Sequence, residues 1–550
     1  MVSKPSAPSA PVSIPTEPEP SGHDVLADPR LHELLVPASR REVQRARQVF
    51  VNRNLRLSGI DLVGFDMDYT LAVYRKQSIE QLSFEMTLDR MIQKRGYPES
   101  IRSLAYDHAF VMRGLAVDRV WGNLLKMDRF RHIGRAYHGR TLLASEEKKR
   151  VYRGEKIDLK SERFAWIDTL FALPEACLYA EVVETLEAAG QKVDFDKLYV
   201  DIRECIDEVH RDDSLKSVIR TDLARFIVPD PELGPALHKL RSGGKKLFLL
   251  TNSGWDYTDL VMKFLLDGFL PEYPSWRHYF DLVVSAAGKP SFFSENRPFL
   301  EVDPSTNKPI GEARTLERGK AYQGGNLADF ERMAGIGGEK VLYVGDHIYG
   351  DILKSKKSSL WRTCMIIEEL EDEIAYTDRC ASDVTRLSAL ESLRARLDDE
   401  VNTRKLALNA LERRLERSGL DEETRRHVED VRKKEKAELE RLRKALKESG
   451  EEAEALEARV EKGFNSYWGL MFKEGTENSR FGEQVEQYAC IYTSRVSNLL
   501  AYSPMQYFRS PREFMPHERV GASNGSGNGK GAPAVMAPLG SEGPPKGSVA

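Results

Sequence analysis

Four short apolar runs, each followed by a polar cluster, constrain the fold of this chain more than any other feature. They span residues 60–65, 246–250, 282–285 and 341–344 of a 550-residue chain, and helical segments follow each of them. Short, continuous apolar runs that alternate with helices are typical of a parallel sheet covered on both faces. The sequence therefore predicts an α/β fold.

The polar clusters that follow these runs should lie together. Ligands of open parallel sheets bind beyond the carboxyl ends of the strands, and every cluster falls at that edge or in the loop beyond it. The clusters contain the candidate site residues Asp66 and Asp68; Thr251, Asn252 and Ser253; Lys289; and Asp346 and Asp351.

Asp66 and Asp68 are two residues apart at the end of the first run. Alternation along a strand points residues i and i+2 to the same face, so both carboxylates can reach one reacting group. Phosphoryl transfer often uses such a pair, in which one carboxylate attacks phosphorus and the other handles the proton. Short acidic runs at strand ends also arise as helix caps and solvated loops, so the pair alone is a weak signal.

The order of the four clusters resembles the four-motif signature of haloacid dehalogenase-like phosphohydrolases. The resemblance implies that Asp66 is the nucleophile and forms an aspartyl-phosphate, and that Asp68 is the acid and then the base. Mg²⁺ would be bound by Asp66, the backbone carbonyl of Asp68 and Asp346, with Asp351 in support. Thr251 and Lys289 would help to neutralise the phosphate. The alternatives are a helix cap for Asp351, a solvated loop lysine for Lys289 and a strand-end turn for Thr251.

Longer segments are similar to those of the cytosolic purine 5′-nucleotidase family, over about residues 40–518. They are 64–71, 251–253, 345–357, 361–363 and 515–518, and the match at 345–357 is the most specific. The resemblance implies hydrolysis of purine nucleoside 5′-monophosphates, with IMP and GMP preferred. Some members of the family also transfer the phosphoryl group to a nucleoside.

The segment between the first two motifs is far longer than a strand-to-helix connection requires, which indicates a cap with a function of its own. By periodicity alone, the charged residues around position 205 would be a solvated helix face and Phe171 would belong to the core. The family resemblance instead implies that Phe171 stacks on the purine. The substrate-binding residues that it implies are Phe171, Arg203, Asp207, His210, Lys216, Thr251, Asn252, Ser253 and Lys289.

One departure from the family concerns regulation. Eukaryotic members have an adenine-nucleotide activator site with an Arg and an Asn, and the aligned positions here are Asp158 and Asp168. Acidic groups would face a polyphosphate, so we expect no activation by ATP.

Leucine and valine recur at seven-residue spacing between about residues 388 and 462, as in Val401, Leu408 and Leu415. A helix stop and cap at 418–421 divides this segment, which predicts an antiparallel hairpin with a coiled-coil seam. Arg404 and Glu435 interrupt the seam. We expect a structural or oligomeric role for the hairpin.

These observations predict a Rossmann-like parallel sheet core with a large, mainly helical cap inserted after the first strand and a C-terminal helical hairpin. The predicted parts are a disordered N-terminal tail (1–25), a catalytic core (26–74 and 236–392), the cap (75–235), the hairpin (393–462), a C-terminal segment packing on the core (463–519) and a disordered tail (520–550).

Composition narrows the setting in which the protein works. The formal net charge of −4 argues against a general nucleic-acid binder, and no apolar run approaches the roughly 20 residues that cross a bilayer. The five cysteines have no zinc-like or paired spacing, which favours a reducing compartment. We expect a cytoplasmic homo-oligomer that binds neither nucleic acid nor membrane. A phosphatase for another small phosphate or a phosphoprotein, or an inactive coiled-coil interaction protein, are the alternative functions.

Overall fold

The computed structural model describes residues 43–153, 157, 161–353, 359–417 and 419–512. The chain divides into two units, Met1–Arg45 and Ala46–Ala550, and the fold described below is that of the second. Several predictions fall outside the described residues: both disordered tails, the motif residues 354–357 and 515–518, and Asp158.

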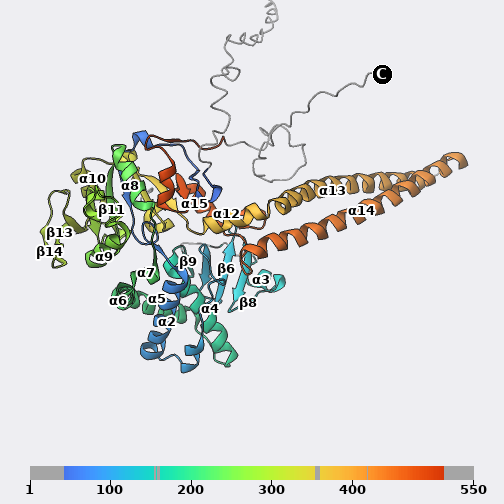
Figure 1. The fold of residues 1–550 in the computed structure, drawn as a ribbon. Coiled ribbons are helices and arrows are strands. Elements are labelled where there is room, and N and C mark those ends of the chain that lie inside the picture. Colours follow the sequence, from blue (N-terminus) through green and yellow to red (C-terminus); the bar gives the residue numbers. More distant parts are fainter. Residues whose placement is uncertain (1–42, 154–156, 158–160, 354–358, 418, 513–550) are drawn as a thin grey trace, which may run out of the picture. The chain divides into compact units, whose positions relative to one another are not determined.

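A large mixed sheet forms the core of the described residues (Figure 1). Its seven neighbouring parallel strands are β20, β17, β16, β3, β11, β12 and β15, and antiparallel strands complete both edges. In spatial order the strands are β1 (Phe50–Val51), β20 (Ile491–Thr493), β17 (Arg362–Ile366), β16 (Val341–Gly345), β3 (Leu62–Phe65), β11 (Lys246–Leu250), β12 (Leu282–Ser285), β15 (Ala321–Gly324), β13 (Phe299–Asp303) and β14 (Lys308–Glu312). The predicted α/β class with a parallel sheet is confirmed.

The central strands are buried, which explains their continuous apolar sequences. All residues of β3, β12 and β16 are buried. A Cβ atom at Gly64 of β3 would lie 2.0 Å from the ring of Phe248, so only glycine lets this ring pack across the centre of the sheet. Helices α9 (Trp255–Leu266), α10 (Leu327–Ala334) and α12 (Leu370–Arg379) follow core strands, whereas α8 (Leu233–Ser242) and α15 (Arg480–Tyr488) precede the core strands β11 and β20.

The segment 75–235 forms a cap of helices and a second sheet. Its helices are α2 (Lys76–Arg95), α3 (Ser145–Tyr152), α4 (Leu173–Ala188), α5 (Phe195–Arg211), α6 (Ser214–Thr221) and α7 (Leu223–Phe226). Its five-stranded antiparallel sheet has the order β8 (Thr141–Leu142), β7 (Ile133–His138), β6 (Asn123–Met127), β5 (Leu115–Asp118) and β9 (Phe164–Ile167). The prediction of a mainly helical cap did not include this sheet, because its central strands are buried on both faces and lack alternation.

A short two-stranded ladder joins the cap to the core. Strand β4 (Val73–Tyr74) immediately precedes the first cap helix, and β10 (Ile227–Val228) immediately follows the last. The two pair antiparallel, with Tyr74 opposite Ile227. The chain therefore enters and leaves the cap through one hydrogen-bonded connection.

The predicted hairpin is present as α13 (Ala381–Leu415) and α14 (Glu422–Phe464), which lie side by side (Figure 1). It begins about a dozen residues before the predicted boundary at 393, because α13 continues from α12 with one intervening residue. Val401 and Leu439 are buried in the seam, and Asp421 caps α14 by accepting a hydrogen bond from the backbone N–H of Thr424. The C-terminal segment goes on to supply β20 to the core sheet.

Candidate active site

Three carboxylates and one ammonium group meet beyond the carboxyl ends of β3, β16 and β12. Oxygen atoms of Asp66, Asp346 and Asp351 lie within 4.8 Å of one another, and all three residues are buried. Lys289 Nζ lies 2.9 Å from Asp66 Oδ2 and 2.7 Å from Asp351 Oδ1. The structure thus brings together four residues that are spread over almost 290 positions of the sequence.

Strand register places the first two carboxylates side by side. Phe65 of β3 pairs with Val344 of β16 in neighbouring parallel strands. Asp66 and Asp346, which follow these two strands, therefore lie at the same edge of the sheet. Asp351 follows in a π-helical turn, η8 (Ile348–Leu353), a kind of turn that is frequent at functional sites. A Cβ atom at Gly345 would lie 2.6 Å from the side chain of Asp351, so glycine is what allows this close approach.

The site contains more negative than positive charge. Burial raises the pKa of Asp66 well above its ordinary value, although Lys289 opposes the rise. Burial and the neighbouring Asp351 raise the pKa of Asp346 to about 7. Burial alone would lower the pKa of Lys289, but Asp351 and Asp66 raise it, so this group stays an ammonium.

This donor set fits a hard divalent cation. When all three carboxylates are ionised, one ammonium leaves two negative charges uncompensated in a buried space, so ionisation of the group favours a bound cation. Carboxylate and carbonyl oxygens are the ligands that Mg²⁺ prefers. Asp66, Asp346 and Asp351 are the residues whose side chains could hold it.

Thr251, Asn252 and Ser253 follow β11 and order the neighbouring loops. Asn252 accepts a hydrogen bond from the backbone N–H of Lys289 at 2.7 Å and donates one to its carbonyl at 2.9 Å. Thr251 is fully buried, and its Oγ1 accepts a hydrogen bond from the N–H of Ser253. Asn252 therefore holds the Lys289 loop in place in addition to lining the pocket described next.

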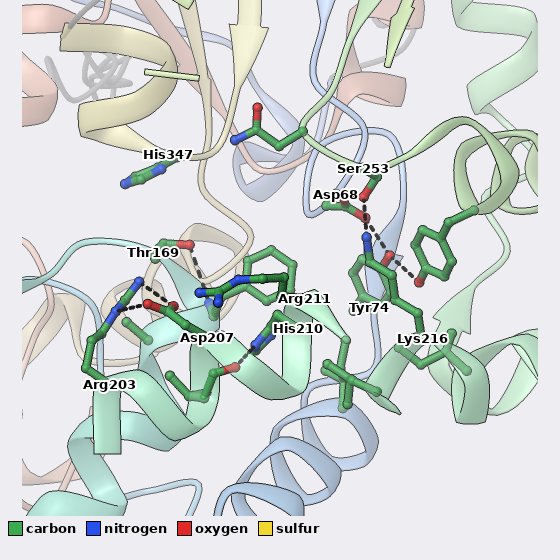
Figure 2. Close-up of a pocket in the computed structure, with 18 residues that line it drawn as sticks. Asp68, Tyr74, Thr169, Arg203, Asp207, His210, Arg211, Lys216, Ser253 and His347 are labelled. Carbon is green, nitrogen blue, oxygen red and sulfur yellow. Dashed lines mark hydrogen bonds and ion pairs between the residues drawn. The ribbon is translucent and has the colours of Figure 1, made fainter. Parts of the chain in front are cut away.

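A pocket of about 610 Å³ lies beside the carboxylate group, between the cap and the sheet edge (Figure 2). This volume is within the range of small-molecule sites. Of the nine predicted substrate-binding residues, seven line it: Phe171, Arg203, Asp207, His210, Lys216, Asn252 and Ser253. Lys289 lies instead with the carboxylates, and Thr251 is buried at the end of β11. Asp68 also lines the pocket, so it joins the two halves of the site.

Helix α5 presents its predicted residues to the pocket (Figure 2). Arg203 pairs with Glu175 at 2.8 Å and with Asp207 at 3.0 Å. His210 Nδ1 lies 2.7 Å from the carbonyl oxygen of Ile206, and burial lowers the pKa of this histidine, so the ring is neutral near pH 7. The ring of Phe171 meets that of His210 edge to face, with 5.6 Å between centroids.

Comparison with known proteins identifies the family. The profile of the 5′ nucleotidase family matches residues 49–520. The chain belongs to this family.

Two relatives illustrate the similarity. A 5′-nucleotidase domain-containing protein of Dictyostelium discoideum is 32% identical over 478 residues, covering 86% of this chain and 75% of that protein. Human 5′-nucleotidase domain-containing protein 2 is 30% identical over 509 residues, covering 90% and 87%. The predicted family is thus confirmed, and with it the prediction that this 5′-nucleotidase family member is an enzyme.

Sequence reasoning missed several residues that line the pocket of this family member. They are Tyr74, Thr169, Arg211, His347 and Tyr257, among others. Arg211 follows His210, and His347 follows Asp346, so adjacency to predicted site residues was the available signal. Tyr74 lies only six residues after Asp68, whereas nothing local in the sequence indicates Tyr257, which reaches Tyr74 only through the fold.

His347 connects the fourth motif to the cap. Its Nε2 lies 3.2 Å from Oδ1 of Asp168, one of the two acidic residues at the family's activator positions. Burial alone would lower the pKa of His347, but Asp168 raises it to about 9. Asp168 is therefore already paired with a cation of this chain.

Proposed function

We propose that this protein hydrolyses purine nucleoside 5′-monophosphates through an aspartyl-phosphate on Asp66. The observation that supports this most directly is the position of Asp68, which lines a nucleoside-sized pocket two residues from the buried carboxylate Asp66. A phosphate placed at the carboxylate cluster would leave its ester oxygen and nucleoside on the pocket side.

In the first half-reaction, a carboxylate oxygen of Asp66 attacks phosphorus and the bond between phosphorus and O5′ breaks. Asp68 gives its proton to the departing oxygen, and the nucleoside leaves as a neutral alcohol. Lys289 compensates negative charge next to Asp66 from 2.9 Å.

In the second half-reaction, Asp68 is a carboxylate and accepts a proton from water as the water oxygen attacks phosphorus. The bond between Asp66 and phosphorus breaks, which releases inorganic phosphate and restores both residues. Replacing water by a nucleoside hydroxyl in this step would give the phosphotransferase activity that the family resemblance implies.

Mg²⁺ is the proposed cofactor. The side chains of Asp66 and Asp346 and the backbone carbonyl of Asp68 would hold it, supported by Asp351. When bound, it supplies positive charge that neutralises phosphate oxygens.

The side chains of the pocket favour a 6-oxopurine. The ring of Phe171 lines the pocket, where it can stack on a purine, and it meets the ring of Tyr69 edge to face with 4.7 Å between centroids. The guanidinium of Arg203 can donate to a carbonyl oxygen, and the carboxylate of Asp207 can accept from a ring N–H, a complementary pair for inosine and guanosine bases. The 6-amino group of adenine would face the guanidinium of Arg203, and two donors cannot hydrogen-bond to each other.

A phosphatase for another small phosphate ester is the second candidate, because the carboxylate cluster alone does not select a nucleoside. A phosphoprotein fits less well, since the cap covers the sheet edge. An inactive interaction protein is the least supported alternative, since it would not explain why the carboxylates and the lysine of the site are all present. We continue to expect a cytoplasmic homo-oligomer that is not activated by ATP. Separately, none of the described helices is both long and apolar enough to cross a membrane.

The test is phosphate release from IMP, GMP, AMP, CMP and UMP with Mg²⁺ present. We expect IMP and GMP to be the best substrates, and Asp66→Asn to reduce the rate by about a thousandfold or more, because it removes the nucleophile. Asp61→Asn is the matched control: it changes an Asp at the opposite end of the same strand, next to Lys340. No release from any nucleotide, or equal rates in Asp66→Asn and wild type, would refute the proposal.

A further inference from the structure

Both carboxylate oxygens of Asp68 are held by hydroxyl groups. Tyr74 donates to Oδ1 at 2.6 Å, and Ser253 donates to Oδ2 at 2.7 Å. Two donors on opposite oxygens fix the plane of a carboxylate as well as its direction. The orientation of Asp68 toward the pocket therefore depends on where these two hydroxyl groups lie.

Tyr74 belongs to the connection between core and cap. It lies on β4, which pairs with β10, and these two strands are where the chain enters and leaves the cap. The tyrosine is only 3% exposed and its ring contacts that of Tyr69 at 5.0 Å between centroids. A shift of the cap about this connection would move the hydroxyl group that holds Oδ1.

The second hydroxyl is also in contact with the cap. Lys216 on α6 donates to Oγ of Ser253 at 3.3 Å, and its ammonium lies 4.8 Å from the centre of the Tyr257 ring (Figure 2). The hydroxyl groups of Tyr257 and Tyr74 are 3.0 Å apart. The contacts thus close a ring through Asp68, in which Lys216 comes from the cap, Tyr74 from the connection, and Ser253 and Tyr257 from the core.

We propose that Tyr74 is a positioning residue that orients the Asp68 carboxylate toward the leaving oxygen only when the cap is in place, with Lys216 acting in the same way through Ser253. This inference rests on the proposed function, in which Asp68 protonates the leaving oxygen. In the open protein Asp68 would then be misdirected, so it would neither protonate the leaving oxygen nor accept a proton from the attacking water. Proton transfer and attack both depend steeply on such alignment.

The dependence on leaving group tests this role. An alkyl ester such as IMP or glycerol 2-phosphate needs a proton on its departing oxygen, whereas p-nitrophenolate leaves readily without one. Steady-state kcat and KM would be measured for all three esters with the full-length chain, together with thermal unfolding of each variant.

For Tyr74→Phe we expect kcat/KM, which reports the first half-reaction alone, to fall by about ten- to a hundredfold on the alkyl esters and by less than about threefold on p-nitrophenyl phosphate. Tyr106→Phe is the matched control, since it removes a buried hydroxyl that hydrogen-bonds Glu80 within the cap. For Lys216→Met we expect a smaller loss with the same dependence on leaving group.

Equal losses of kcat/KM on alkyl and aryl esters, or no loss of kcat/KM on either, would overturn the inference. A rise in KM alone for Lys216→Met would remove Lys216 from it. If the wild-type protein cleaves glycerol 2-phosphate but no nucleotide, the proposed substrate is refuted. The role of Tyr74 can still be tested with glycerol 2-phosphate and p-nitrophenyl phosphate. Inactivity on all three esters would overturn both.

Discussion

Two arginine–glutamate ion pairs show how differently the same chemistry works in two regions of this molecule. Arg113 of the cap pairs with Glu369 of the core at 2.5 Å, with side chains 0% and 14% exposed. Arg404 of α13 pairs with Glu435 of α14 at 2.9 Å, with side chains 35% and 22% exposed. The first pair joins residues 256 positions apart, and the second only 31.

The surroundings of the two pairs decide what each can do. Arg113 also donates to the backbone carbonyl of Asp346 at 3.0 Å, so it connects the cap directly to the carboxylate group. Arg404 and Glu435 occupy an interruption of an apolar seam and face solvent in part. A buried charge depends on its partner, whereas water and salt can replace an exposed one.

The largest stability effect should therefore follow from Arg113→Met. Burial would raise the pKa of Glu369, but Arg113 and, to a smaller extent, Lys76 lower it to about 2, so the variant would leave a buried carboxylate without its main partner. We expect a loss of about 3–5 kcal/mol in the free energy of unfolding by urea. Arg113→Met combined with Glu369→Leu should recover part of it, because no isolated charge remains.

The sign of the pH dependence is a further check on this pair. Since the pKa of Glu369 is about 2 in the folded protein and its ordinary value is 4.5, the stabilisation is present above pH 4.5 and is lost as pH falls toward 2. The difference between wild type and Arg113→Met should shrink over that interval. A difference below 1 kcal/mol at pH 7 would mean that the pair is no more important than an exposed one.

The next effect concerns the charge imbalance at the sheet edge. MgCl₂ should raise the thermal unfolding temperature relative to EDTA, because a ligand at a hundred times its Kd stabilises the folded state by about 2.7 kcal/mol. Asp346→Asn should remove most of this increment, whereas Asp383→Asn, at the exposed ion pair with Arg459 near the start of α13, should retain it. An equal increment in both variants would place the cation elsewhere.

The difference between the two regions also explains what the sequence predicted. The hairpin is local: heptad spacing, a glycine at position 419 with φ of 100° and a capping aspartate define it within one segment. The sheet edge was predictable because each apolar run is followed directly by a polar cluster, and these clusters carry the family motifs. In both cases the signal lies in neighbouring residues.

What the sequence did not predict depends on contacts between distant segments. The hydroxyl groups of Tyr74 and Tyr257 meet although the residues are 183 positions apart, and Asp168 meets His347 only because the cap lies over the fourth motif. The five-stranded cap sheet was missed for a similar reason, because its strands are identified by their partners and not by alternation. All three features, the two side-chain contacts and the cap sheet, depend on tertiary packing.

The smallest effect should come from the hairpin pair. Replacing Arg404 and Glu435 together by Leu fills an interruption of the seam between buried Val401 and Leu439, so the gain in apolar contact offsets the lost ion pair. We expect a change within about 1 kcal/mol of wild type, measured as loss of helical circular dichroism in urea. In 1 M NaCl, Arg404→Met alone should barely change the free energy of unfolding, because exposed charges are screened. The loss of stability in Arg113→Met should persist, because its ion pair is buried. If both single variants responded to salt alike, burial would not be what separates the two regions.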